Sequence, residues 1–413
     1  MVAGRSGLIA ALDVGASKVC CFIAILEGDG GLRIIGIGHQ VSHGMHAGAV
    51  VDMEALEASV RAAVDAAERM AGEPVRDVVI GLSGGAPRSV TRSIEVAIAG
   101  HQVGEADINS AIEQARRDCA PFEREVVHCR PASFAIDGSR GVKDPRGMYG
   151  DRLGVEVHIV TAATAPVRNL ENCIRRGHLG VAGMALTPYA SGRACLVEDE
   201  MDLGVTLIDM GGGTTSVAVF LHGAMVFADV LPVGGKHVTK DIARGLLAPP
   251  AEAERIKTLY GSAISSPSDD REMIAVPQLG ESGEEEATRI SRSMLIGIIR
   301  PRLEETFELV RERLVDSGFF SAAGRRVVLT GGASQLHGAA NLAGRILDKQ
   351  IRIGRPLRLK GLAEATAGPA FSACAGLLAL AGEEWRQGGS PEAEMAPSAK
   401  RFSRVTRWFK ENF

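Results

Sequence analysis

A strand–turn–strand pattern with an aspartate at the end of its first strand occurs twice in this chain. One copy spans residues 9–22 and the other spans residues 207–220. Their aspartates, Asp13 and Asp209, are 196 residues apart in a chain of 413. Each pattern predicts a β-hairpin with a glycine-containing turn. A copied hairpin at half-chain spacing predicts two related halves.

The residue types in both turns suit phosphate and magnesium. Glycines let backbone N–H groups approach phosphate oxygens, hydroxyls add donors, and a lysine adds positive charge. Each aspartate can hold a water of a Mg²⁺ shell. One such turn alone would also fit an ordinary hairpin, so the prediction depends on both copies. The expected phosphate-binding residues are Asp13, Gly15, Ala16, Ser17, Lys18, Asp209, Gly211, Gly212, Gly213, Thr214 and Thr215.

Two further Gly-Gly pairs stand where helices are expected to begin. The run Arg326-Val-Val-Leu-Thr is an apolar strand followed by Gly331, Gly332 and Ser334, a turn on which a nucleoside could lie. The other pair, Gly234 and Gly235, is followed by Lys236. We add all six residues to the candidate site.

Composition excludes several classes of protein. A 46% hydrophobic chain of this length suffices for two domains with full cores. The net charge of −4 argues against an electrostatic nucleic-acid binder. The 7 cysteines contain no Cys-x-x-Cys pair, which suits buried thiols in a reducing compartment. The longest apolar run, residues 370–381, is too short to cross a bilayer.

The three glycine motifs, in this order, resemble the phosphate-1, phosphate-2 and adenosine motifs of the actin, chaperone and sugar-kinase superfamily, over roughly residues 8–380. The resemblance implies an α/β fold, in which duplicated actin-like (ribonuclease H-like) domains flank a nucleotide cleft. The implied cofactors are ATP and Mg²⁺, with the metal held mainly through water by Asp13 and Asp209.

Finer features resemble the FtsA family of bacterial cell-division proteins. Residues 42–52 form a Ser-x-Gly-Met-x-x-Gly-x-Val-x-Asp frame, and residues 197–204 resemble the segment before phosphate-2 in that family. His43 and His46 lie within this frame, and His39 precedes it. We expect them to be turn or surface histidines. A three-histidine metal site is the alternative, but their spacing does not place them on one helix face.

The family resemblance also implies a division of the chain into subdomains. Residues 84–161 resemble the inserted subdomain 1C, associated with self-contact and recruitment. A helix around residues 298–307 resembles the subdomain 2B helix of the family, which borders two sites. The resemblance implies that Glu305 borders the adenine pocket. It implies that Arg302 borders the groove for the tail of the tubulin-like protein FtsZ. For Arg302, a plain surface cation is the alternative. The expected subdomains are 1A (1–83 and 162–200), 1C (84–161), 2A (201–235 and 311–381) and 2B (236–310).

Two departures from the superfamily pattern concern hydrolysis. Thr187 stands before the connecting proline, where several actin-like ATPases carry an acidic residue that positions water, and Ser216 stands where a carboxylate is common. Their absence should slow water activation without impairing phosphate binding. We therefore expect a nucleotide switch with at most slow hydrolysis.

The last residues combine a flexible composition with a basic, aromatic segment. Residues 382–399 mix Gly, Pro, Ser and Glu, which is typical of a linker. Residues 400–413 would form an amphipathic helix about 21 Å long, able to lie on an anionic membrane. A docking helix for another protein is the alternative. The membrane-facing candidates are Phe402, Val405, Trp408, Phe409 and Phe413, flanked by Arg401, Arg404, Arg407 and Lys410.

Together with these features, the resemblance to the FtsA family implies an ATP-binding, polymerising protein that tethers FtsZ filaments to the cytoplasmic face of the inner membrane at the septum and recruits later division proteins. The expected partners are the FtsZ tail, further copies of the chain, those later proteins and the membrane, but not nucleic acid. One alternative is a cytoskeletal adaptor similar to PilM or MreB, and another is a small-molecule kinase of the same superfamily.

Overall fold

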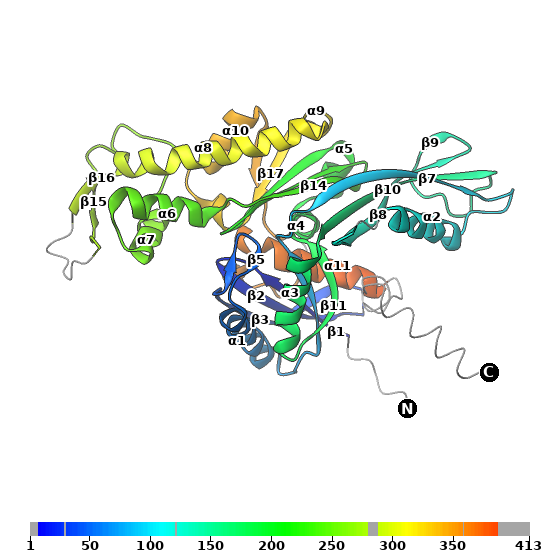
Figure 1. Ribbon diagram of the computed structural model, residues 1–413, viewed down its shortest axis with the longest axis horizontal. Helices are drawn as coiled ribbons and strands as arrows, with labels where there is room; N and C mark the ends of the chain where they lie inside the picture. The colour runs from blue at the N-terminus through cyan, green and yellow to red at the C-terminus, as the bar shows by residue number, and fades with distance from the viewer. Residues whose placement is uncertain (1–6, 29, 120–121, 280–287, 358, 387–413) are drawn as a thin grey trace.

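Two five-stranded mixed sheets with the same strand order organise the molecule (Figure 1). The computed structural model describes residues 7–386, apart from 29, 120–121, 280–287 and 358. The first sheet has the order β11 (Gly180–Leu186), β6 (Asp77–Leu82), β1 (Leu8–Val14), β2 (Lys18–Leu26), β3 (Leu32–Val41). The second has the order β18 (Gln350–Ile353), β17 (Arg326–Thr330), β12 (Val205–Met210), β13 (Thr215–Leu221), β14 (Ala224–Leu231).

The pairing of these strands repeats in detail. Strand β1 pairs antiparallel with β2 and parallel with β6, and β12 pairs in the same way with β13 and β17. Asp13 lies opposite Cys20 and Asp209 lies opposite Ser216, each one pair before the last of its hairpin. The predicted duplicated α/β architecture is therefore confirmed.

Local sequence explains where α1 (Met53–Ala71) begins and ends. The Asp52 side chain accepts hydrogen bonds from the N–H groups of Glu54 and Ala55, and Gly72 ends the helix in the left-handed region. Its buried positions recur at helical spacing and pack on β2 and β3. Asp52, the last residue of the 42–52 frame, is thus a helix cap.

Helices α4 (Thr187–Cys195) and α11 (Ser372–Arg386) pack against each other beside the two sheets. A Cβ on Gly376 would lie 1.7 Å from the Ala190 oxygen, so the two backbones meet where no side chain fits. Helix α4 follows the first sheet and leads, through α5 (Glu198–Leu203), into the second. It is therefore a direct covalent link between the halves.

A separate four-stranded sheet forms the right-hand end of the molecule in Figure 1. Its order is β7 (Arg88–Ala97), β10 (Arg152–Ala163), β8 (Arg124–Ile136), β9 (Ser139–Val142), and α2 (Glu105–Asp118) packs against it. This unit leaves the chain after β6 and returns at α3 (Thr164–Arg176). It also contacts the second half, because the Ala228 N–H donates to Ser89 Oγ at 3.3 Å.

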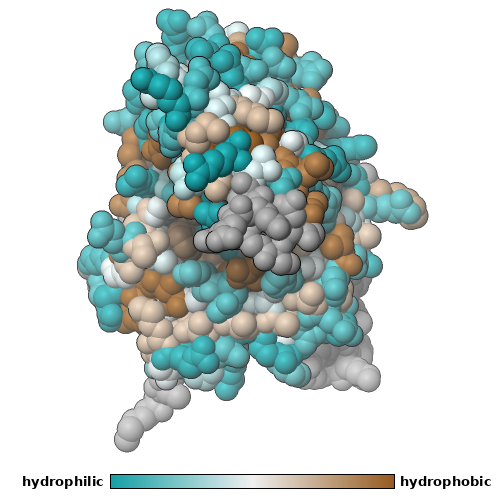
Figure 2. All heavy atoms as spheres, turned by 90° about the vertical axis from the view of Figure 1, so that its left-hand side faces the viewer, coloured by the Kyte–Doolittle hydropathy of each residue, from teal (hydrophilic) through white to brown (hydrophobic). Residues whose placement is uncertain are grey.

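The opposite end carries α6 (Gly235–Leu246), α7 (Pro250–Tyr260), the hairpin of β15 (Met273–Val276) and β16 (Thr288–Ser291), and the long helix α8 (Arg292–Asp316). Figure 2 shows hydrophobic side chains among hydrophilic ones on this end. The remaining elements are β4 (Met45–His46), β5 (Ala49–Val50), α9 (Phe319–Ala322), η2 (Gly332–Gln335), α10 (Ala339–Leu347), η3 (Glu364–Thr366) and η4 (Pro369–Phe371).

Helix α11 continues to Arg386, past the expected start of the linker at residue 382. The rest of that linker and the expected amphipathic segment at 400–413 lie outside the described residues. Across the part that is described, no helix is long and apolar enough to cross a membrane.

Candidate functional site

A cavity of about 540 Å³ lies where the two duplicated hairpins meet. Its wall contains the ends of β1 and β12, the start of α6, the turn after β17 and the segment before α11. The structure therefore brings together residues that are hundreds of positions apart. The predicted residues on its wall are Asp13, Gly15, Ala16, Ser17, Lys18, Asp209, Gly211, Gly212, Gly213, Thr214, Gly235, Lys236, Gly331 and Gly332.

Both turns close with the same backbone hydrogen bond. The Gly15 N–H donates to the Lys18 oxygen at 3.0 Å, and the Gly211 N–H donates to the Thr214 oxygen at 2.8 Å. The next two N–H groups of each turn, at positions 16, 17, 212 and 213, have no acceptor within the described part of the chain. Such consecutive N–H groups form a concavity that binds anions.

The turns approach each other so closely that Gly212 cannot carry a side chain. A Cβ on Gly212 would lie 1.9 Å from Ser17 Oγ. Glycine at this position is therefore required by the approach of the two halves. The repeated pattern predicted from sequence forms one continuous wall.

Asp209 is buried and Asp13 is half-buried, and the two lie near each other on this wall. Burial raises the pKa of Asp209 to about 6; the hydrogen bond from Ser191 Oγ to Asp209 Oδ2, at 2.5 Å, opposes this rise, and repulsion from Asp13 adds to it. Burial also raises the pKa of Asp13, against the attraction of Lys18. Two carboxylates that are costly to ionise in the protein alone would be stabilised by a cation between them.

The turn after β17 lies against Asp209. Gly331 has φ +86°, and a Cβ there would lie 2.3 Å from Asp209 Oδ1. A side chain at this position would be strained and would displace the carboxylate. The third glycine motif is thus in direct contact with the second.

Two lysines of the site bridge separate segments. Lys18 Nζ donates to the Ala370 oxygen and lies 3.6 Å from the centre of the Phe371 ring. Lys236 Nζ donates to the Ala16 oxygen at 2.6 Å, and burial lowers the pKa of Lys236. Both ammonium groups line the cavity while holding a carbonyl of another segment.

Four predicted residues lie behind or beside the wall. Thr215 Oγ1 donates to the Val233 oxygen at 2.8 Å, and Ser334 Oγ donates to the Gly331 oxygen at 2.7 Å. Gly234 precedes α6, whose first N–H, from Gly235, donates to the Gly211 oxygen at 2.9 Å. Glu305 pairs with Arg302 on the partly exposed side of α8. Thr215, Gly234 and Ser334 thus brace the turns that line the cavity.

The wall also contains residues that the sequence analysis did not select. Gly48, Ser83 and Thr187 lie on the side of the first sheet, and Lys257, Arg292 and His337 lie on the side of α7 and α8. They belong to no shared motif, and only the folded chain places them together. Of these six, only Thr187 is singled out in the sequence for its chemistry, as the residue before Pro188, and it is not among the predicted binding residues.

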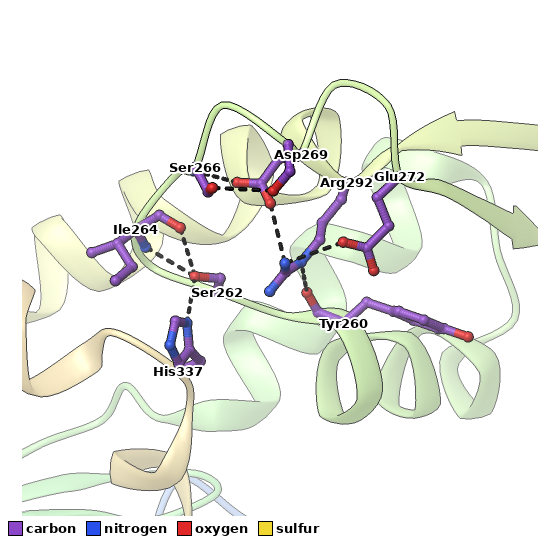
Figure 3. A network of polar contacts seen from close by, with 9 residues as sticks. Tyr260, Ser262, Ile264, Ser266, Asp269, Glu272, Arg292 and His337 are labelled. Atoms are coloured by element: carbon purple, nitrogen blue, oxygen red, sulfur yellow. Dashed lines mark hydrogen bonds and ion pairs between the residues drawn. The ribbon is translucent and has the colours of Figure 1, made fainter.

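A partly buried polar network supports the outer wall of the cavity (Figure 3). Arg292 Nη1 contacts Asp269 Oδ1 at 3.1 Å and Glu272 Oε2 at 3.2 Å, while its Nε donates to the Tyr260 oxygen at 3.0 Å. Close by, Ser262 Oγ lies 3.0 Å from His337 Nδ1. The network fixes the loop after α7 against the start of α8.

Replacing Asp269 by alanine is expected to lower the free energy of unfolding by about 2–4 kcal/mol, because an almost fully buried carboxylate is removed from Arg292 and from the Ser266 N–H. Glu272→Ala is the matched control. Glu272 contacts the same arginine but is largely exposed, so its loss should cost no more than about 0.5 kcal/mol. Urea unfolding measures both changes, and equal effects would contradict a special role for Asp269.

Arg302 ties α8 to α6. Its Nε donates to Asp241 Oδ2 at 2.5 Å and its Nη2 donates to Asp241 Oδ1 at 3.2 Å. The same end of the molecule exposes Leu247, Met273, Leu279 and Met294. Arg302 is therefore part of an ion-pair network rather than an isolated surface cation.

The histidines of the 39–46 segment contact different parts of the structure. His39 packs edge-on against Phe371, and His46 Nε2 lies 3.4 Å from Lys240 Nζ. Within the described residues, no group of three or more His, Cys, Asp or Glu side chains could hold a metal ion.

Comparison with known proteins identifies relatives over the whole chain. The family model "Cell division protein FtsA" matches residues 206–376, and "SHS2 domain inserted in FTSA" matches residues 84–161. The chain is similar to the cell division protein FtsA of Rhizobium meliloti (strain 1021), with 43% identity covering 99% of this chain and 96% of the relative. It is similar to that of Pseudomonas aeruginosa, with 36% identity covering 100% of both.

Solved structures agree on the fold. The PilM-PilN type IV pilus biogenesis complex has a TM-score of 0.65 at 20% identity, covering 92% of this chain and 99% of the other. MreB5 of Spiroplasma citri bound to ADP has a TM-score of 0.53 at 14% identity, covering 92% and 99%. These matches confirm the actin-like fold. With its duplicated domains, its inserted sheet and relatives of this identity along its whole length, the chain belongs to the FtsA family of bacterial cell-division proteins.

Proposed function

We propose that this chain binds ATP·Mg²⁺ in the cavity between its halves and uses the nucleotide to control its own polymerisation. The observation that carries this proposal is the pair of glycine turns, which face each other with their free N–H groups on one wall. Consecutive N–H groups suit phosphates, and a cavity of about 540 Å³ is large enough for a nucleotide.

The residues present fit the nucleotide and the metal. The turns at 15–18 and 211–214 would hold the phosphates, with charge from Lys18 and Lys236. Asp13 and Asp209 would hold Mg²⁺ mainly through water, and the metal would neutralise phosphate charge. Gly331 and Gly332 would lie under the nucleoside, while Thr215, Gly234 and Ser334 would support these turns from behind. Glu305 is proposed at the edge of the adenine pocket.

We propose slow hydrolysis at most. The acidic residues on the described wall are Asp13, Asp209 and Glu254. The first two are assigned to the metal, and Glu254 is bound by Lys257 at 2.7 Å and by Thr239. Thr187, before Pro188, offers a hydroxyl, which is a weak general base compared with a carboxylate. The nucleotide would therefore act mainly as a switch between assembly states.

Family membership and the basic, aromatic residues 400–413 support a tethering role. In this proposed role, the protein lies at the cytoplasmic face of the inner membrane at the division septum. It binds the FtsZ tail in a groove near Arg302 and recruits later division proteins. The same membership favours this role over the pilus-adaptor and kinase alternatives.

Co-sedimentation tests the tether directly. A labelled FtsZ tail peptide should pellet with anionic vesicles only when this protein is present, and more with ATP·Mg²⁺ than with ATP and EDTA. Uncharged vesicles are the control for the anionic surface, and a scrambled peptide is the control for the groove. Peptide that stays in the supernatant while the protein pellets would contradict the tethering role.

A further inference from the structure

Helix α4 presents a stripe of three polar side chains, spaced four residues apart, toward the junction of the two halves. Ser191 Oγ donates to Asp209 Oδ2 at 2.5 Å, and Cys195 Sγ lies 3.7 Å from Thr330 Oγ1. Thr187, the first of the three, is 7% exposed, and its Oγ1 has no hydrogen-bond partner in the described structure. Two members of the stripe are therefore satisfied by protein, and the third is not.

Thr187 lies at the edge of the first sheet that borders the cavity. Strands β1, β6 and β11 are neighbours and run parallel, so their carboxyl ends lie at one edge of the sheet. Asp13 lies near the end of β1, Ser83 follows β6, and Thr187 follows β11. All three line the cavity. Ligands of open α/β sheets bind at such an edge.

Asp13 and Thr187 both approach Gly81, which has no side chain. A Cβ on Gly81, in β6, would lie 3.3 Å from Leu377 Cδ1 and 3.4 Å from both Asp13 Oδ1 and Thr187 Oγ1. The carboxylate proposed for the metal and the unpaired hydroxyl thus face the same small space. The N-terminus of α4, which begins at Thr187, adds a partial positive charge there.

A buried hydroxyl without a partner destabilises a folded protein, and such groups call for an explanation. Packing alone would be served better by valine, which has the same shape without the polar atom. A ligand that supplies an acceptor oxygen beside Asp13 would satisfy the hydroxyl. The nearest groups built for a ligand are the two phosphate turns and the aspartates of the metal site.

We propose that the Thr187 hydroxyl donates a hydrogen bond to the terminal phosphate of the bound nucleotide and so distinguishes a triphosphate from a diphosphate. Thr187 is then a specificity-determining residue, and its place at the start of α4 connects phosphate recognition to the helix that joins the halves. This inference rests on the proposed nucleotide site.

Two variants separate the hydroxyl from the rest of the side chain. Thr187→Val removes the hydroxyl and keeps the shape, whereas Thr187→Ser keeps the hydroxyl and removes the methyl group. Equilibrium binding of ADP and of a non-hydrolysable ATP analogue, both with Mg²⁺, gives the ratio of their affinities for each protein. The thermal midpoint without nucleotide is the second measurement.

Thr187→Val should weaken binding of the ATP analogue roughly tenfold, the size of one hydrogen bond to a charged group, and change ADP binding less than about twofold. Its midpoint without nucleotide should not fall, because no protein hydrogen bond is lost. Thr187→Ser should keep the preference for the triphosphate.

Three results would overturn the inference. Unchanged affinities for both nucleotides in Thr187→Val would exclude the contact, and equal losses for both nucleotides or a lower midpoint would assign Thr187 a structural role. Failure of the unmodified protein to bind either nucleotide would overturn the proposed site itself, and is distinguishable because it needs no variant.

Discussion

Replacing Asp209 by asparagine is expected to lower the affinity for ATP·Mg²⁺ by roughly 10–100-fold, the range typical of losing support at a metal site. The amide has the shape of the carboxylate and can still accept from Ser191, but it lacks the charge that attracts the metal shell. Calorimetric titration with ATP measures the change in the presence of Mg²⁺ or EDTA. In EDTA the variant and the unmodified protein should differ little.

The same substitution should stabilise the protein when nucleotide and metal are absent. Because burial raises the pKa of Asp209 to about 6, ionising this group above that pH costs the folded state about 3 kcal/mol relative to the unfolded chain. Asparagine removes that cost. The gain in stability should be full above about pH 6, shrink as the pH falls, and vanish well below about pH 4, where both states of the unmodified protein are protonated.

Glu254→Gln is the control for a carboxylate on the same wall. Glu254 is bound by Lys257 and Thr239, so its substitution should change magnesium-dependent binding only about two- to threefold. Retained magnesium-dependent affinity in Asp209→Asn would refute the coordination role. A loss of stability at neutral pH would contradict the electrostatic account of this site.

Short-range sequence patterns predicted the duplicated core of the molecule. Asp13, Asp209 and the turns that follow them repeat within a few residues, so their hairpins could be predicted one at a time. The spacing of the copies then predicted the duplicated domains. Neither step required knowledge of contacts between distant segments, and the structure confirms the duplicated fold.

The rest of the wall depends on how distant segments meet. Lys18 was predicted as a phosphate ligand, but its contact with Ala370 and Phe371 arises where the chain returns to the first sheet. Arg292 follows a hairpin with no motif and reaches the cavity through its pairing with Asp269. The missing partner of Thr187 is likewise visible only after folding, because it is defined by what surrounds the hydroxyl.

Deleting residues 402–413 is expected to abolish flotation with anionic vesicles. The segment lies outside the described residues, and the prediction is based on its composition: five basic residues at 400, 401, 404, 407 and 410 and five apolar ones that recur at helical spacing. Each basic residue near an anionic surface contributes about 1 kcal/mol, and aromatic side chains add burial in the headgroup region. The shortened chain keeps only the basic residues at 400 and 401 and none of the apolar ones, which is too little for binding, and its nucleotide affinity should be unchanged.

A substitution separates membrane binding from docking onto another protein. Changing Trp408 and Phe409 together to alanine removes apolar anchors and keeps every charge, so flotation should fall strongly even at low salt. Changing Arg404 and Arg407 to glutamine should instead weaken flotation mainly on anionic vesicles, and added salt should reduce the remaining binding. Undiminished flotation in the deletion would place the membrane contact elsewhere in the chain. Flotation that needs a second protein would favour the docking helix, because a lipid anchor of this kind acts through the bilayer alone.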